Sequence, residues 1–289
     1  MRKTTTFRRL LDRTGPTLIP GVYDALSAAI AQETGFDAVA ITGAGLSVTH
    51  GYPDLGLMTL TEVVERARAV VRGTSLPVLV DADTGYGGVL NIERTVREFE
   101  AVGVAALHLE DQVTQKRCGL LEGIQVVSVE QMTARVRAAV AARSDPDFCV
   151  VARTDVRACG QLADVITRAH AYRAAGADAI FLFDLHSRAE LEVAAREIPG
   201  PKITHVSRGG RVAPIPPAEL ADMGYQAICY PLTPLQAAAH ALRTALVHLR
   251  DDASLEPLYD RMVKPVELYE LVGLTRAQEF ARDYEREEA

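Results

Sequence analysis

The chain has 289 residues, 48% of them hydrophobic, which is enough to build the core of one large α/β domain or of two modest ones. Its formal net charge of -7 and its pI of about 5.6 argue against a nucleic-acid surface or a polybasic membrane patch. These totals favour a protein that handles small molecules.

Three local features predict the compartment of the protein. The basic N-terminal segment, residues 1–11, lacks the apolar core and cleavage site of a secretory signal. No apolar run approaches the length of about 18 residues that a membrane span needs. The cysteines are spread without metal-ligand or disulfide spacing, at Cys118, Cys149, Cys159 and Cys229. We therefore expect a reduced, cytoplasmic protein that binds neither membrane nor nucleic acid.

Short apolar segments alternate with amphipathic segments of helical period along most of the chain. In chain order, we expect strand 16–21, helix 25–34, strand 37–42, helix 60–71, a strand from residue 77, helix 92–102, strand 105–111, helix 129–142, strand 148–153, helix 162–175, strand 179–184, helix 188–197, strand 202–206, helix 217–223, strand 226–230 and helix 235–249. The N-cap of helix 129–142 is expected at Ser128.

Eight strands separated by helices are typical of a parallel (β/α)₈ TIM barrel, with a doubly wound open sheet as the alternative. The α/β barrel is favoured because eight units are the number that closes. We assign residues 1–250 to the barrel domain and residues 251–289 to a helical C-terminal extension. The apolar positions of this extension need a surface to pack on, and a neighbouring subunit is a plausible one.

The strand that begins at residue 77 ends in two carboxylates and a glycine-rich turn, residues 81–88. Asp81 and Asp83 are two residues apart, so both side chains are expected on the same side of the strand. Two carboxylates held this close repel each other unless a proton or a cation lies between them, and Mg²⁺ suits such oxygen ligands. Taken alone, the pair is equally well interpreted as two turn or N-cap aspartates.

Polar residues also end the other predicted strands, which is where barrel enzymes place their chemistry. They are Tyr23, Asp24, Thr42, His108, Glu110, Asp111, Arg153, Asp155, Asp184, His205 and Tyr230. A lone buried histidine or arginine is more often structural than catalytic, but so many at one rim indicate a site. Glu110 would add an oxygen ligand to the aspartate pair, and Arg153 suits a carboxylate or phosphonate. Backbone N–H groups at residues 43–45 could bind an anion.

The loop around Cys118 is the remaining segment whose residues indicate a chemical role. Lys116 and Arg117 directly precede the cysteine, and two cations there would favour its thiolate and lower its pKa. Gly119 would let the loop move, carrying Cys118 over the site as an acid that protonates a carbanion or enolate. An ordinary surface cysteine is about as good an interpretation of these residues alone.

Six motifs stand in one order along the chain: residues 20–27 (PGVYDALS), 51–56 (GYPDLG), 81–87 (DADTGYG), 109–112 (LEDQ), 116–119 (KRCG) and 152–155 (ARTD). With them, the sequence resembles the isocitrate lyase and phosphoenolpyruvate mutase superfamily over about residues 7–249. The KRCG loop makes it more similar to the 2-methylisocitrate lyase and carboxyphosphonoenolpyruvate mutase branches than to phosphonopyruvate mutases, which lack that cysteine.

The resemblance implies a set of site residues and a quaternary structure. It implies Mg²⁺, with Mn²⁺ as a substitute, held directly by Asp83 and largely through water by Asp81, Asp54 and Glu110. The substrate carboxylate would lie on Thr42, Gly43 and Ala44, with Gly119, His205 and Arg208 also at the substrate. Arg153 and Tyr23 would contact the reacting oxygen, His108 would support the metal, and Cys118 would be the general acid. The implied assembly is a homotetramer in which the last barrel helix is exchanged between subunits.

Four positions depart from the family pattern. Leu120 stands where these lyases have a histidine after KRCG, and Phe183, followed by Asp184, stands where relatives end the sixth strand with a glutamate. His205 and Arg208 stand where relatives show an asparagine and a glutamate. These changes predict an intact metal half of the site and an altered substrate half, suited to a different and more anionic substrate.

Three functions agree with these features. The first is a Mg²⁺-dependent carbon–carbon lyase acting on a small 2-hydroxy or 2-substituted di- or tricarboxylate, similar to 2-methylisocitrate lyase, through a metal-stabilised enolate of a 2-oxo acid. The second is a phosphonate mutase or hydrolase, or an oxaloacetate-type hydrolase or decarboxylase, motivated by His205 and Arg208. The third is a binding barrel without catalysis, motivated by Leu120 and Phe183.

Overall fold

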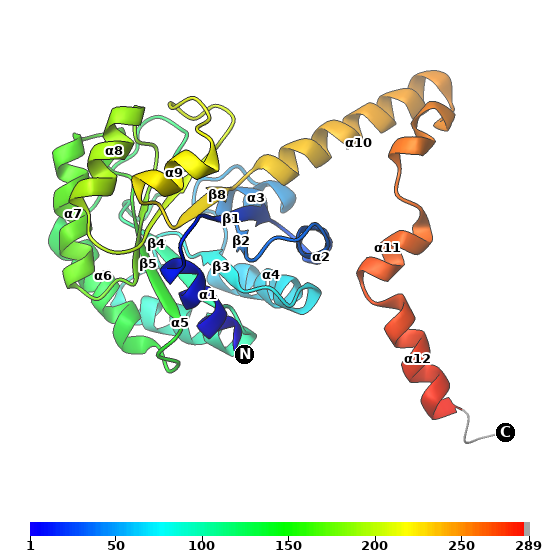
Figure 1. The fold of residues 1–289 in the computed structure, drawn as a ribbon, viewed down its shortest axis with the longest axis horizontal. Helices are drawn as coiled ribbons and strands as arrows, with labels where there is room; N and C mark the ends of the chain where they lie inside the picture. Colours follow the sequence, from blue (N-terminus) through cyan, green and yellow to red (C-terminus); the bar gives the residue numbers. More distant parts are fainter. Residues whose placement is uncertain (286–289) are drawn as a thin grey trace.

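The computed structural model describes residues 1–285, and its centre is a closed barrel of parallel strands hydrogen-bonded in chain order (Figure 1). The strands are β1 (Thr17–Val22), β2 (Val39–Ile41), β3 (Val78–Asp81), β4 (Ala106–Glu110), β5 (Cys149–Thr154), β6 (Ala179–Leu182), β7 (Lys202–His205) and β8 (Ala227–Tyr230). Closure is made by β1 pairing with β8, where Leu18 lies beside Ile228. The expected TIM barrel is confirmed, and the open sheet is excluded.

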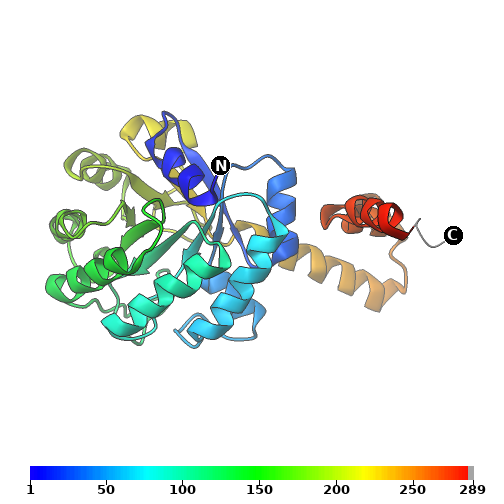
Figure 2. The same cartoon turned by 90° about the horizontal axis from the view of Figure 1, so that it is seen from below.

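Most of the helices in residues 1–285 follow strands and cover the outside of the barrel, whereas the first precedes β1 and the last three lie off the barrel wall (Figures 1 and 2). The helices are α1 (Lys3–Asp12), α2 (Ala25–Glu33), α3 (Gly43–Thr49), α4 (Leu60–Gly73), α5 (Val89–Val102), α6 (Val129–Ala142), α7 (Leu162–Ala174), α8 (Arg188–Glu197), α9 (Pro217–Met223), α10 (Thr233–Asp252), α11 (Pro265–Leu271) and α12 (Leu274–Glu285), with 3₁₀ turns at Val156–Ala158 and Glu256–Arg261. Ser128 caps α6 by accepting a hydrogen bond from the Gln131 backbone N–H at 3.2 Å, as expected.

Two apolar layers hold the barrel together. The outer layer lies between strands and helices, with Val80, Val96 and Ile180 among its fully buried members. The inner layer fills the barrel, and the α1 residue Phe7 is fully buried in the same cluster as Leu79 of β3. Helix α1 therefore contributes its apolar side to the barrel interior, an arrangement that the sequence indicated only as a short amphipathic opening.

The C-terminal helices α10 to α12 form an arm, in which α10 extends away from the barrel and the chain then turns back so that α11 passes close to α2 (Figures 1 and 2). None of the three helices has a buried residue, although Leu242 and Leu246 of α10 are large apolar side chains, each 63% exposed. Segment 235–249, expected as the eighth helix of the barrel wall, thus belongs to the arm. No helix in residues 1–285 is long and apolar enough to cross a membrane.

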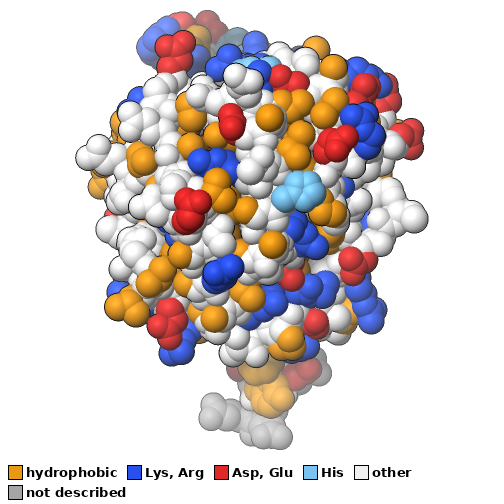
Figure 3. Space-filling model, turned by 90° about the vertical axis from the view of Figure 1, so that its left-hand side faces the viewer, with side chains coloured by type: hydrophobic (Ala, Val, Ile, Leu, Met, Phe, Trp, Pro, Cys, Tyr) orange, Lys and Arg blue, Asp and Glu red, His pale blue; other side chains and the backbone are white. Residues whose placement is uncertain are grey.

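The side of the barrel that faces away from the arm carries charges of both signs (Figure 3). Acidic and basic side chains are interspersed there, and several form ion pairs between neighbouring helices. Arg188 of α8, for example, contacts Glu219 of α9, and Arg157 contacts Glu190 of α8 at 2.8 Å. This mixture is typical of a solvated surface and is unlike a basic nucleic-acid interface.

Candidate active site

A pocket of about 590 Å³ lies at the carboxyl ends of the strands. It is lined by Ala40, Ile41, Thr42, Ala44, Asp54, Asp81, His108, Lys116, Cys118, Gly119, Leu120, Arg153, Phe181, Phe183, Ser207, Cys229, Pro231 and Leu232. Several of the residues predicted from sequence are thus brought together from β2, β3, β4, β5 and the Cys118 loop. This is the end of a TIM barrel at which active sites occur.

Asp81 and Asp83 point to the same place beside β2. The Asp83 backbone N–H donates to Asp81 Oδ1 at 3.0 Å, and the Gly43 N–H donates to Asp81 Oδ2 at 3.2 Å. A Cβ on Gly43 would lie only 2.8 Å from Asp81 Oδ2 and 3.2 Å from Asp83 Oδ1, so the close approach requires glycine. Asp83 itself has a φ of 47°, a left-handed conformation that turns its side chain back toward Asp81.

Lys116 joins this acidic group, a role that the sequence did not indicate. Its ammonium Nζ lies 2.6 Å from Asp54 Oδ1 and 2.7 Å from Asp83 Oδ1. Burial alone would lower the pKa of Lys116, but Asp83, Glu110 and other nearby carboxylates outweigh it and raise the pKa well above its ordinary value. A protonated lysine therefore draws two carboxylates from different segments to one point.

The carboxyl groups respond differently to the shared environment. Burial, supported by Asp81 and Asp54, raises the pKa of Asp83 to about 7. Burial would raise the pKa of Asp81 as well, but the positive groups around it prevail and lower that pKa. Burial also raises the pKa of Glu110 well above its ordinary value. The site thus holds more acid groups than its own cations neutralise.

The chemistry of these donors fits a hard divalent cation. Asp54, Asp81, Asp83 and Glu110 offer oxygens alone, as Mg²⁺ prefers. Both Glu110 carboxylate oxygens are buried without a hydrogen bond, although Arg153 Nη1 lies 3.3 Å from Oε2. Within residues 1–285, no three His, Cys, Asp or Glu side chains are close enough to ligate one ion directly. The residues therefore fit an ion bound by few direct contacts and completed by water.

Arg153 is held from three directions. Asp155 accepts from Nε at 3.0 Å and from Nη2 at 2.7 Å, and Glu110 lies near Nη1. The guanidinium carbon lies 3.9 Å from the centre of the Phe183 ring, within the range of a cation–π contact. On the neighbouring strand, burial lowers the pKa of His108 to about 4, so that this ring is neutral beside Asp81 at 3.6 Å.

Behind Arg153, Asp111 is the centre of a buried hydrogen-bond network. Thr154 Oγ1 donates to Asp111 Oδ2 at 2.7 Å, and the Asp155 N–H donates to Oδ1 at 2.9 Å. From α7, Tyr172 OH and Arg168 Nη1 donate to Oδ2 at 2.9 and 3.1 Å. The network fixes the segment that carries Asp155, and through it the orientation of Arg153.

The Cys118 loop lies over the pocket, but its thiol differs from the expectation. The Cys118 N–H donates to the Asp54 carbonyl at 2.9 Å. Burial, together with the charge of Asp54, raises the pKa of Cys118, whereas the sequence predicted a lowered value. Burial of the thiol outweighs the lowering effect that Lys116 and Arg153 still have on its pKa, and Arg117 donates to the Glu122 carbonyl at 2.9 Å instead.

The remaining predicted substrate residues fall into two groups. Thr42, Ala44 and Gly119 line the pocket, and a Cβ on Gly119 would lie 2.8 Å from Arg153 Nη2. Tyr23 and His205 stand at the ends of their strands but are not among the lining residues, and His205 is stacked behind Phe183. Arg208 is exposed in the β7–α9 loop, so the structure does not bring it to the pocket.

A (β/α)₈ barrel with a buried carboxylate cluster, a paired arginine and a loop cysteine at one rim has the arrangement of a barrel enzyme. A model of the phosphoenolpyruvate phosphomutase family matches residues 7–250. The chain therefore belongs to the phosphoenolpyruvate phosphomutase family, within the superfamily expected from its motifs.

Similar proteins cover the whole length of the chain. The chain is 39% identical over 285 residues to 2,3-dimethylmalate lyase of Eubacterium barkeri, covering 98% of the chain and 99% of the relative. It is 40% identical over 267 residues to 2-methylisocitrate lyase of Halalkalibacterium halodurans, covering 92% and 88%.

Two solved structures are also similar. Oxaloacetate acetylhydrolase in complex with 3,3-difluorooxalacetate is 35% identical, with a TM-score of 0.92 and coverage of 97% of this chain and 96% of that one. Phosphonopyruvate hydrolase in complex with oxalate and Mg²⁺ is 27% identical, with a TM-score of 0.86 and coverage of 98% and 99%.

Proposed function

We propose that the protein is a Mg²⁺-dependent carbon–carbon lyase acting on a small 2-hydroxy or 2-substituted di- or tricarboxylate through the enolate of a 2-oxo acid. The observation that carries this proposal is one pocket lined by Asp81, Asp54, the paired Arg153 and the neutral thiol of Cys118, with Asp83 held beside it by Lys116. Relatives named 2-methylisocitrate lyase and 2,3-dimethylmalate lyase support it.

Asp83 would hold the cation directly, and Asp81, Asp54 and Glu110 would hold its water ligands, with Mn²⁺ as a substitute. When bound, a divalent cation supplies Lewis-acid polarisation of substrate oxygens and stabilises negative charge that develops on them. The solved complex of a similar protein with oxalate and Mg²⁺ supports this choice of metal.

Residues of the site bind the substrate, stabilise charge on it and supply a proton. Thr42, Gly43 and Ala44 bind the substrate carboxylate, while Arg153 stabilises the charge on the reacting oxygen. Cys118 then donates its Sγ proton to the carbon that the broken bond leaves with an electron pair. A raised pKa suits this role, because a general acid must keep its proton until the transition state.

The experiment that tests this function compares two cysteine variants on a panel of 2-methylisocitrate, 2,3-dimethylmalate and oxaloacetate with Mg²⁺. We expect turnover of at least one acid, and a fall in kcat of about 100-fold in Cys118→Ser, the scale of one general acid. Cys159→Ser is the matched control, since Cys159 is exposed and does not line the pocket. Equal rates in both variants, or no turnover of the panel, would contradict the proposal.

For the whole molecule, we propose a cytoplasmic homotetramer in which the arm of α10 to α12 packs on a neighbouring subunit. The support is the arm itself, which has no buried residue in α10, α11 or α12 and exposes large apolar side chains. Such faces need a partner surface, and a second copy of the chain supplies one by symmetry.

A further inference from the structure

The two sides of the pocket differ in chemistry. The strands β2, β3 and β4 lie across the closed barrel from β6, β7 and β8. The first side contributes polar groups, among them Thr42, Asp81 and His108. The second side, which we call the β6–β8 wall, contributes Phe181, Phe183, Cys229, Pro231 and Leu232, and Leu120 of the Cys118 loop also lines the pocket and packs on the barrel interior.

Phe183 is fixed in this wall by stacking on both sides. The imidazole of His205 lies parallel to the Phe183 ring, with centroids 3.9 Å apart and planes at 5°. Arg153 contacts the ring as well, with its guanidinium carbon 3.9 Å from the ring centre. A Cβ on Gly119 would collide with Phe183, so the closed loop also limits its movement. The ring is therefore a rigid part of the pocket surface.

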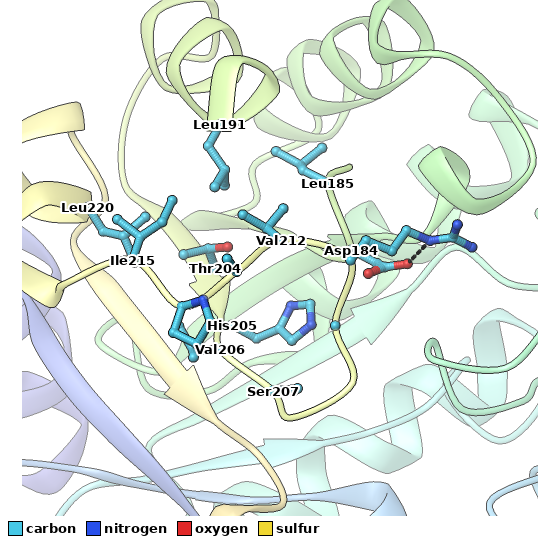
Figure 4. Close-up of a pocket in the computed structure, with 14 residues that line it drawn as sticks. Asp184, Leu185, Leu191, Thr204, His205, Val206, Ser207, Val212, Ile215 and Leu220 are labelled. Atoms are coloured by element: carbon cyan, nitrogen blue, oxygen red, sulfur yellow. Dashed lines mark hydrogen bonds and ion pairs between the residues drawn. The ribbon is translucent and has the colours of Figure 1, made fainter. Parts of the chain in front are cut away.

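No free cation stands behind the β6–β8 wall in the described chain. His205 also lines a second cavity of about 430 Å³, whose other walls are mostly apolar, with Leu191, Val212 and Leu220 among them (Figure 4). The basic side chain of this cavity, Arg211, is paired with Asp184 at 2.8 Å, as the dashed line in Figure 4 marks. Burial, reinforced by Arg153, lowers the pKa of His205 to about 3, so its ring is neutral near pH 7.

The cations of the active-site pocket are already engaged as well. Lys116 pairs with Asp54 and Asp83, and Arg153 makes two hydrogen bonds to Asp155 and lies 3.3 Å from Glu110. A carboxylate placed against the β6–β8 wall would lose its water, and the nearest cation, Arg153, is already paired with Asp155 and Glu110, so little of the lost hydration would be recovered. A neutral group would lose little there, and Ser207 Oγ, which lines the pocket and is buried without a partner, could still hydrogen-bond to it.

We propose that Phe183 and His205 are specificity-determining residues that make the enzyme select substrates whose end opposite the metal-binding side is uncharged. The substrate class is thus a 2-oxo or 2-hydroxy acid whose carboxylates all lie on the side of Thr42 and the metal-binding residues, and whose opposite end, against Phe183, is neutral. This inference rests on the proposed function for the anionic end and narrows its substrate class. It differs from the expectation from sequence that His205 and Arg208 make the pocket suit a more anionic substrate.

The test measures the binding of two 2-oxo acids in the presence of Mg²⁺ by calorimetry. The two probes, 2-oxovalerate and 2-oxoglutarate, share the 2-oxo acid end and the chain length but end in a methyl group and a carboxylate. We expect 2-oxovalerate to bind at least about 10-fold more tightly. Equal or tighter binding of 2-oxoglutarate would overturn the inference while leaving the proposed function intact. Binding of neither probe would overturn both, since the shared end would then have no site.

Two variants of His205 test whether the absence of charge at this residue sets the preference for 2-oxovalerate. His205→Lys places a cation behind Phe183, and we expect the preference for 2-oxovalerate to fall at least about 5-fold, because the added charge stabilises the carboxylate of 2-oxoglutarate. His205→Phe keeps an aromatic, uncharged partner for the stack, and we expect the preference ratio to stay within about 2-fold of the original. A ratio that changes in His205→Phe and not in His205→Lys would overturn the assignment, and thermal unfolding of each variant verifies that it is folded.

Discussion

At the scale of single residues, the site is shaped by the balance between burial and charge. Lys116 is buried and stays protonated because it contacts two carboxylates, whereas the half-buried His205 has its ring covered by Phe183 and stays neutral. Burial therefore has opposite results for the two basic residues. What decides the result is the presence or absence of an acidic neighbour.

The neutrality of His205 predicts a pH dependence of stability. The folded pKa, about 3, is below the ordinary value of 6.5, so the unfolded chain binds a proton more readily than the folded chain. The stabilisation that the neutral His205 gives to the folded chain is complete above pH 6.5. It is lost as the pH falls toward about 3, by about 1.4 kcal/mol of unfolding free energy per pH unit. Between pH 6.5 and 5, the unfolding free energy of the native sequence should fall about 2 kcal/mol more than that of His205→Phe.

Urea unfolding at the two pH values measures this difference. His205→Phe is the control, because it has every other titrating group of the native chain. Parallel loss of stability in both proteins would show that His205 is protonated in the folded state. That result would also remove one of the supports for an uncharged β6–β8 wall, because a charged imidazole would then face the stacked ring.

At the scale of elements, helix α7 supports Arg153 from outside the barrel. Tyr172 and Arg168 reach Asp111, and Asp111 accepts from the Asp155 N–H, so the helix and the end of β5 share one buried network. We expect Tyr172→Phe to lower the unfolding free energy by about 1–2 kcal/mol and kcat by about 10-fold, since Asp111 loses one donor and Arg153 is held less firmly.

Thr167→Ala on the exposed side of α7 is the matched control, because its hydroxyl donates only to the Ala163 carbonyl of the same helix. It should change stability by less than about 0.5 kcal/mol and leave kcat unaltered. If Tyr172→Phe were as stable and as active as this control, the network would not position Arg153.

Elements were far easier to predict from the sequence than their contacts. The helices at 129–142, 188–197 and 217–223 have the predicted bounds, because capping residues and apolar period are local signals. Strand β6 ends at Leu182, two residues before its predicted end. Asp184 has a left-handed φ of 49°, which no sequence pattern indicated. The sequence predicted that Asp81 and Asp83 point to the same side, but it did not indicate that Gly43, which follows the adjacent strand β2, approaches both carboxylates.

Long-range contacts of loops were not predictable in the same way. Lys116 reaches Asp54, 62 residues away in the chain, and the folded loop buries the Cys118 thiol, which raises its pKa although Lys116 still acts to lower it. The position of Arg208 after β7 predicted a substrate ligand, but in the structure this residue is exposed in its loop. Nothing in the spacing of these residues encodes where a loop folds, because that depends on packing against the whole rim.

At the scale of the whole molecule, the arm leaves one side of the barrel without its eighth helix. Helix α10 follows β8 directly but extends from the barrel, and its apolar residues are exposed (Figure 1). Helix α2 of the barrel also exposes Leu26 and Ile30, at 39% and 40%. Exposed apolar faces on both the arm and the barrel favour an exchange of arms between copies of the chain.

This arrangement predicts that the assembly depends on the apolar side of α10. In the full chain, we expect Leu242→Glu combined with Leu246→Glu to weaken self-association at least about 100-fold, since each leucine contributes about 1.5–3 kcal/mol when it is buried and a glutamate would have to be desolvated. Arg243→Gln, at an exposed polar position of the same helix, should leave the assembly unchanged. Sedimentation equilibrium of the three proteins measures the mass of each assembly. A native chain that sediments as a monomer, or a double variant that sediments as the native assembly, would show that the arm does not hold subunits together.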